Sequence, residues 1–268
     1  MMKSLVKSID QSENWAGLNA AADWVVEESV RIQQIPAPSF HEAERAAYVA
    51  AQFRALGLSD VDVDEVHNAY GCLRGSEPGR PALLLIAHTD TVFAADTDLT
   101  IRREGRLIYG PGLGDNSLGV AALLGALRWF QQHGQRPACD LWCVATSCEE
   151  GLGNLRGIRA AFARLRDRIA MGINLEGLAF GHVYHAGIAV QRLHIIAEAE
   201  GGHSWLHFGR SSAVHGILEL GARLTRMPVS RAPRSTFNVG MIEGGQAINA
   251  IATRAGLWLD LRSEGQVE

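Results

Sequence analysis

The stretch PALLLIAHTD, residues 81–90, decides the predicted fold, because an unbroken aliphatic run leads directly into His88. A continuous apolar run of this kind is typical of a strand buried on both faces, as in a parallel sheet. CDLWCVAT (139–146) and MGINL (171–175) are two further candidate strands, and helical patterns cover 117–133 and 154–169. Because strands and helices alternate, the chain predicts an α/β domain with a mostly parallel central sheet.

Two more helices are predicted ahead of this run. The first covers residues 20–34, and the second follows the two prolines of IPAPS (35–39). In the second, we expect Ser39 to be the N-cap and Glu42 to complete a capping box. The helix should run to about Leu56 and end at Gly57.

The pattern changes after about Gly187. A long strand is expected over 188–200, a helix over 212–227, and a pair of strands over 236–244 and 253–263. This β-α-β-β order predicts a separate, smaller α+β domain. We therefore expect one domain over residues 1–186 and a second, partial one over 187–268.

The composition excludes several classes of partner. The 268 residues are 47% hydrophobic with a net charge of −4, and the basic residues are scattered, so neither nucleic acid nor an anionic membrane is expected as a partner. No apolar run approaches the ~20 residues of a membrane helix, and MMKSLVKSID (1–10) lacks the apolar core of a signal peptide. The four cysteines form no CxxC pair, which favours buried free thiols and a cytoplasmic location.

Polar clusters stand at the ends of the predicted strands or the start of a helix. They are HTD (88–90), GDN (114–116), EEG (149–151) and LEG (175–177). Ligands of open α/β sheets bind at the carboxyl ends of the strands, so one histidine and five carboxylates should meet at one edge. Carboxylates this close repel one another, and a pair of divalent cations would neutralise them.

Each cluster alone has an ordinary structural explanation. A histidine after a strand is usually structural, Asp115 could begin a helix, and the Glu149–Glu150 pair could lie in a solvated loop. Together they favour a metal site. The glycines of GPGLGD (110–115) also suggest a dinucleotide-binding loop, but Asp115 occupies the position of the third glycine and would repel a pyrophosphate.

The motifs HTDT, GPGLGDNSLG, CEEG, NLEG and GGHSW, in this order, resemble the M20 family of metallopeptidases and deacylases. That family includes carboxypeptidase G2-like enzymes, peptidase T, acetylornithine deacetylase and succinyl-diaminopimelate desuccinylase. The resemblance implies a zinc-peptidase-like catalytic domain and a ferredoxin-like lid that pairs two chains into a homodimer. It also implies cleavage of a small peptide or an N-acyl amino acid by metal-activated water, with two Zn²⁺ per complete site and Co²⁺ or Mn²⁺ as alternatives.

The resemblance also assigns metal ligands. His88 and Glu176 would bind the first metal, Glu150 the second, and Asp115 would bridge the two. The peptide bond between Asp115 and Asn116 would be cis.

Other residues would act around the metals. Asp90 would orient the His88 ring by a hydrogen bond, and Glu149 would be the general base. In the lid, His203 of GGHSW would reach a neighbouring active site and stabilise the tetrahedral intermediate, and Asn249 of QAINAIATRA would contact substrate. A strand near 205–211 and the helix over 212–227 are the expected dimer contacts.

The chain departs from the family pattern in one respect. The family's second metal has a further histidine ligand near the C-terminus of the catalytic domain, and no histidine here fits it by motif. Because the sequence ends inside the predicted lid, we expect a fragment or a truncated product with a weak second site. A non-catalytic remnant that acts as a dimerising or binding module is the alternative function.

Overall fold

The structure is a computed structural model that describes residues 18–177 and 181–265. The chain forms two compact units, residues 1–181 and 182–268. The predicted domain boundary after residue 186 lies slightly further along the chain. The N-terminal stretch 1–10, in which no signal peptide is expected, lies outside the described residues.

The first unit is built on a mixed five-stranded sheet. In spatial order its strands are β1 (Ser59–Val63), β2 (Ala69–Leu73), β6 (Leu141–Thr146), β3 (Ala82–His88) and β7 (Ile169–Asn174). β6, β3 and β7 are parallel, whereas β1 and β2 extend the sheet with antiparallel pairs. The predicted α/β class is confirmed, and β1 and β2 are strands that the sequence patterns did not predict.

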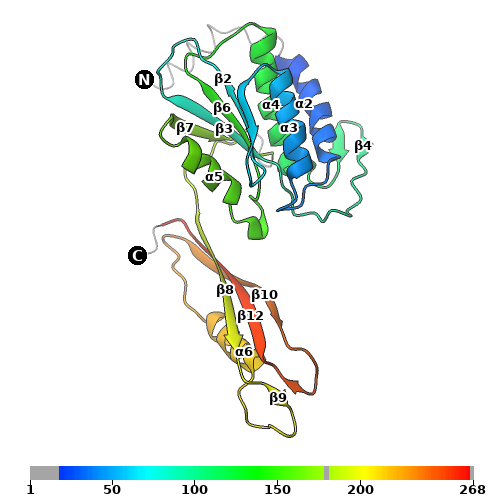
Figure 1. Cartoon of the computed structure of the whole chain (residues 1–268), viewed down its shortest axis with the longest axis vertical. Helices are drawn as coiled ribbons and strands as arrows, with labels where there is room; N and C mark the ends of the chain where they lie inside the picture. The colour runs from blue at the N-terminus through cyan, green and yellow to red at the C-terminus, as the bar shows by residue number, and fades with distance from the viewer. Residues whose placement is uncertain (1–17, 178–180, 266–268) are drawn as a thin grey trace. The chain divides into compact units, whose positions relative to one another are not determined.

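Helices cover both faces of this sheet (Figure 1). They are α2 (Leu18–Gln33), α3 (Ala43–Ala55) and α4 (Leu118–Gln132) on one face and α5 (Arg156–Leu165) on the other. Phe53 of α3 and Leu124 of α4 share a core cluster with Ala87 of β3, while Leu165 of α5 packs with Trp142 of β6. The two covered faces explain the unbroken apolar runs of β3 and β6.

Two predicted helix starts are wrong. α5 begins at Arg156, because Asn154 and Leu155 have left-handed backbone angles that end any helical hydrogen bonding before them. α3 begins after Glu42, which makes no side-chain cap, and Ser39 lies outside the helix with its hydroxyl donating to Asp90 instead. The capping-box prediction is therefore wrong.

Short elements complete the first unit. β4 (Arg102–Glu104) and β5 (Leu107–Tyr109) form a hairpin, and two single helical turns are η1 (Leu113–Ser117) and η2 (Gly151–Gly153). The turn η1 leads directly into α4. Among the described residues, no helix has both the length and the apolar character needed to cross a membrane.

The second unit is a three-stranded antiparallel sheet with one helix. β8 (Ala189–Glu198), β12 (Arg254–Ser263) and β10 (Ser235–Gly244) lie in the order β10-β12-β8. α6 (Ala213–Leu224) packs Ile217 against Leu257 and Leu259. The predicted α+β arrangement is confirmed.

A small ribbon in this unit corrects one expectation. β9 (Gly202–His203) pairs with β11 (Ala250–Ile251). After β9 the chain turns, with the amide of His207 donating to the carbonyl of His203. The strand predicted near 205–211 is therefore wrong, because these residues form consecutive turns.

Candidate metal centre

The parallel strands bring the predicted polar clusters to one edge of the sheet. β3, β6 and β7 run in the same direction and end at His88, Thr146 and Asn174. The residues that follow them include the carboxylates of the HTD, EEG and LEG clusters. Asp115 reaches the same edge from the turn η1.

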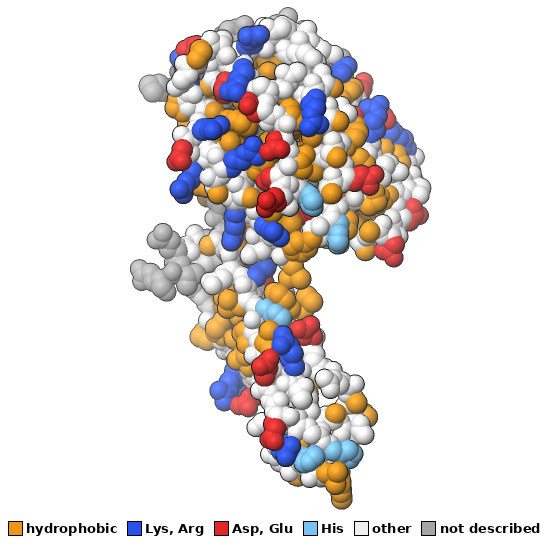
Figure 2. Space-filling model, viewed as in Figure 1, with side chains coloured by type: hydrophobic (Ala, Val, Ile, Leu, Met, Phe, Trp, Pro, Cys, Tyr) orange, Lys and Arg blue, Asp and Glu red, His pale blue; other side chains and the backbone are white. Residues whose placement is uncertain are grey.

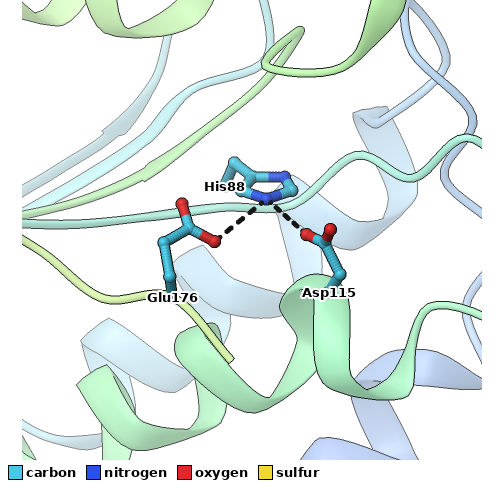
Figure 3. A group of neighbouring side chains, drawn as sticks. All are labelled: His88, Asp115 and Glu176. Carbon is cyan, nitrogen blue, oxygen red and sulfur yellow. Dashed lines mark hydrogen bonds and ion pairs between the residues drawn. The ribbon is translucent and has the colours of Figure 1, made fainter. Parts of the chain in front are cut away.

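His88, Asp115 and Glu176 form a compact group (Figure 3). The His88 Nε2 atom lies 3.0 Å from Asp115 Oδ1 and 3.6 Å from Glu176 Oε2. Their ligand atoms all lie within 4.8 Å of one another. His88 is buried, whereas both carboxylates are partly open to solvent. One nitrogen and two carboxylate oxygens around a single point are a donor set that fits a divalent cation.

Local contacts hold this group in place. The Asp115–Asn116 peptide bond is cis, as expected. The Asn116 side chain donates to the carbonyl of Leu175, which ties the turn η1 to the residue before Glu176. Asn174 donates to the other carboxylate oxygen of Glu176 at 2.9 Å.

One glycine, Gly177, allows this approach. A Cβ atom on Gly177 would overlap the carbonyl oxygen of Gly114. The two backbones can therefore lie this close only because position 177 has no side chain. Asp115 directly follows Gly114, and Glu176 directly precedes Gly177, so the two close backbone segments carry these two carboxylates.

Glu149 and Glu150 lie beside the first group. Their carboxylate oxygens and a ring nitrogen of His88 also lie within 4.8 Å of one another. Burial raises the pKa of Glu150 to about 7, and the charges of Asp115 and Glu149 add to the effect. The adjacent glutamates thus face a shared centre from the end of β6.

Asp90 connects the histidine to the two glutamates. Its carboxylate is fully buried and lies 3.5 Å from His88 Nδ1. It accepts the backbone amides of Glu149 and Glu150, each at 2.9 Å, and the Ser39 hydroxyl at 2.7 Å. Burial opposes ionisation, but hydrogen bonds from His88, from Ser39 and from the two backbone amides hold the pKa of Asp90 below its usual value.

The electrostatics of the site favour a bound cation. Burial disfavours charge on His88, yet hydrogen bonds to Asp115, Asp90 and Glu176 raise its pKa to about 12. Burial, together with the neighbouring carboxylates, raises the pKa of Glu149. The clustered negative charge therefore favours a positive partner at this site, and a divalent cation would be one.

His203 and Asn249 lie in the second unit. His203 is in β9 and pairs with Ala250 of β11, and the amide of Ser204 donates to the carbonyl of Asn249. The structure therefore brings these two predicted residues next to each other.

Three supporting residues were missed by sequence reasoning. The sequence spacing predicts a helix cap for Ser39 and Glu42, and Asn68 belongs to no recognised motif. The Ser39 hydroxyl donates to Asp90, while the side chains of Asn68 and Glu42 accept the amides of Ser147 and Cys148, just before Glu149. Only the SxxE spacing could have singled out the first two, and it pointed to the wrong partners.

Comparisons with known families agree with this geometry. Residues 68–192 match the model of peptidase family M28, and residues 181–268 match the peptidase dimerisation domain of the M20 type.

Two curated relatives span most of the chain. A succinyl-diaminopimelate desuccinylase from Corynebacterium glutamicum is 26% identical, covering 93% of this chain and 68% of the relative. Carboxypeptidase G2 from a Pseudomonas species is 27% identical, covering 84% of this chain and 54% of the relative. The chain thus spans between half and about two thirds of the length of these relatives.

Solved structures share the fold. Aminopeptidase PepT from Bacillus cereus has a TM-score of 0.65 at 22% identity, over 91% of this chain and 67% of that one. The YXEP protein of Bacillus subtilis, described as a dinuclear metal binding peptidase, has a TM-score of 0.57 at 15% identity, over 92% of this chain and 66% of that one. The solved structures confirm the fold, and the match to the peptidase dimerisation domain, together with the two curated relatives, confirms the resemblance of this chain to the M20 family of metallopeptidases and deacylases.

Proposed function

We propose that this chain carries the metal centre of an amidohydrolase that cleaves a peptide or an N-acyl amino acid. The observation that carries the proposal is the convergence of His88, Asp115 and Glu176 beside Glu149 and Glu150. A non-catalytic remnant is not favoured, since the named relatives are enzymes.

Zinc is the proposed metal, because it accepts mixed histidine and carboxylate ligands; cobalt or manganese are alternatives. His88, Asp115 and Glu176 would hold the first ion, and Asp115 with Glu150 would hold a second. A divalent cation in such a site supplies Lewis-acid chemistry, in that it acidifies water and polarises a carbonyl group. Asp90 would fix the orientation of the His88 ring.

Glu149 is the proposed general base. Its raised pKa and its place beside His88 suit a carboxylate that accepts a proton and later returns it. It would take one proton from the attacking water as the water oxygen bonds to the scissile carbonyl carbon. It would then deliver that proton to the amide nitrogen as the carbon–nitrogen bond breaks.

The substrate class follows from the names of the relatives. One relative is named a succinyl-diaminopimelate desuccinylase and the other a carboxypeptidase, and both names refer to compounds that carry carboxylates. We therefore expect an acidic or zwitterionic small substrate, such as a dipeptide or an N-succinyl amino acid.

The second unit would act as a lid and pair two chains into a homodimer. Hydrophobic and histidine side chains gather at the end of this unit where β9 lies (Figure 2). Among them Trp205, Phe208 and Ile248 are largely exposed, which is typical of an interface.

His203 would act from this lid. Its Nδ1 atom accepts the amide of Trp205, so the ring proton is on Nε2. His203 could thereby donate to a developing oxyanion, while Asn249 would contact substrate.

A cytoplasmic location is proposed on the basis of the thiols. The cysteines at 72, 139, 143 and 148 are free, and three of them are buried, as suits a reducing compartment.

The test is hydrolysis of a panel of dipeptides, N-acetyl amino acids and N-succinyl amino acids by metal-loaded protein. Zinc, cobalt and manganese are compared, with the metal-free chain as control. Metal-dependent release of an amino acid that is abolished in His88→Ala supports the proposal. Absence of metal-dependent hydrolysis across the panel, by a chain that binds metal, would count against it.

A further inference from the structure

Four consecutive backbone amides, those of residues 147–150, each donate to a side-chain oxygen from elsewhere in the first unit. The acceptors are Asn68 Oδ1 for Ser147, Glu42 Oε1 for Cys148, and the two carboxylate oxygens of Asp90 for Glu149 and Glu150, each at 2.9 Å. This segment carries the two glutamates that face the metal centre. We call residues 147–150 the glutamate segment.

The three acceptors are fully buried and come from different places in the fold. Glu42 precedes α3, Asn68 precedes β2, and Asp90 follows β3. Buried amides need a partner, and one left without it costs about 1–3 kcal/mol. Side chains from three places in the fold therefore hold the amides of the segment, in addition to the backbone bonds that the carbonyls of Cys148 and Glu150 accept from Arg156 and Gly153.

The glutamate segment needs such support because its backbone is unusual. Cys148 has a φ of 51°, in the left-handed region that residues with a side chain rarely adopt. This left-handed residue lies directly before Glu149 in the chain. Relaxation of Cys148 to an ordinary backbone angle would turn both carboxylates to other positions.

Glu42 holds the left-handed residue itself. Its Oε1 atom accepts the amides of both Phe40 and Cys148, at 3.0 and 2.9 Å. It makes no cap for its own helix α3. Its carboxylate is thus directed at the loop it belongs to and at the glutamate segment, 106 residues further along the chain.

We propose that Glu42 is a positioning residue for the metal centre, acting through the amide of Cys148 to place the carboxylates of Glu149 and Glu150. This inference rests on the proposed metal centre and adds to it a residue that touches neither metal nor substrate. The Oε1 atom of Glu42 accepts both amides, whereas its buried Oε2 atom has no hydrogen-bond partner among the described residues, so the proposed role rests on the Oε1 oxygen.

Three variants test this claim. Glu42→Ala removes the acceptor, and Glu42→Gln keeps an acceptor oxygen at the same reach without the charge. The matched control is Glu28→Ala, because Glu28 is equally buried but bonds to Tyr48 and Arg31, away from the metal centre. Zinc and cobalt affinity are measured by competition with a chromophoric chelator, and amide hydrogen exchange of residues 147–150 is measured without metal.

The Glu42→Ala variant should bind metal about 10- to 100-fold more weakly, the usual effect of removing a residue that supports a ligand. Its amides at 147–150 should exchange faster, and its cobalt spectrum should change. Glu42→Gln should return affinity and exchange close to the wild type. Glu28→Ala should lower thermal stability and leave both readouts unchanged.

Other outcomes would overturn the inference. If Glu42→Ala loses only stability, with wild-type metal affinity and exchange of the glutamate segment, then Glu42 is merely structural. If Glu42→Ala does not fold, Glu42→Asp is compared with Glu42→Gln. Aspartate is shorter than glutamate by one methylene group, so its carboxylate oxygen lies further from the amide of Cys148. Equal metal affinity of these two variants would then refute the proposal. If the wild-type chain binds no metal, the proposed function is contradicted instead. Amide hydrogen exchange of residues 147–150 in Glu42→Ala still tests the contact between Glu42 and Cys148 in that case.

Discussion

Replacing Asp90 by asparagine should weaken both the first unit and its metal site. The Asp90 carboxylate uses one oxygen for the amide of Glu149 and the other for the amide of Glu150 and the Ser39 hydroxyl. Asparagine keeps a single acceptor oxygen. Its NH₂ group must therefore face at least one backbone N–H, from which an NH₂ group cannot accept a hydrogen bond.

The size of the effect follows from this loss. A hydrogen bond to a charged acceptor contributes about 1.5–3 kcal/mol, and the orphaned amide cannot reach water because the site is buried. We expect the free energy of unfolding to fall by about 2–3 kcal/mol. For a chain of this size that is a drop in melting temperature of about 4–12 °C. Metal affinity should fall about 10- to 100-fold, since His88 and the two glutamates lose their common anchor.

The assay is urea unfolding and thermal melting of the metal-free chain, followed by zinc competition. Asp140→Asn is the matched control, because Asp140 accepts the amide of Gly75 and an Arg74 contact near the start of β6, away from the metal centre. That control should bind metal normally. An Asp90→Asn variant within about 0.5 kcal/mol of the wild type, with unchanged zinc affinity, would refute the reasoning.

Three further outcomes are expected. Glu149→Gln should keep metal affinity and lower kcat about 10²- to 10⁴-fold, because the amide cannot accept a proton; substantial residual turnover would remove Glu149 from the role of base. Gly177→Ala should weaken metal binding at least about tenfold, because the new methyl overlaps the Gly114 carbonyl. Gly114→Ala should leave metal binding unchanged, because its methyl meets no neighbouring atom. Equal effects of the two variants would contradict the close-approach argument. In a thiol titration of the native chain, Cys139 alone should react rapidly. Cys72, Cys143 and Cys148 are buried, and burial raises the pKa of Cys72 to about 11. Rapid reaction of all four thiols would show that the core is open.

The apolar runs were sufficient to predict the edge of the sheet that carries the site. β3 and β6 are covered on both faces, so their sequences are continuously hydrophobic and their ends are easily recognised. β1 was missed because SDVDV is a half-exposed edge strand with charges in alternation. β2 is short and interrupted by Gly71, which weakens a strand pattern.

The support around the site could not be predicted in the same way. Ser39 and Glu42 fit a capping box by spacing, yet their partners lie 51 and 106 residues away. A local motif records which hydrogen bonds are possible nearby, whereas the tertiary fold decides which ones form. The proposed metal ligands were recognisable because five ordered motifs agreed, but Asn68 belongs to no motif and is found only through its contacts.

The central claim is that His88, Asp115 and Glu176 hold a divalent cation. The most direct test is the metal content of the 268-residue chain after loading with zinc and exhaustive dialysis, compared with His88→Ala. In the proposed assignment the first ion has three protein ligands, whereas the second has Asp115 and Glu150 alone. We therefore predict close to one zinc per wild-type chain and almost none in the variant. Zinc-free wild-type protein, or equal zinc in both chains, would contradict the claim.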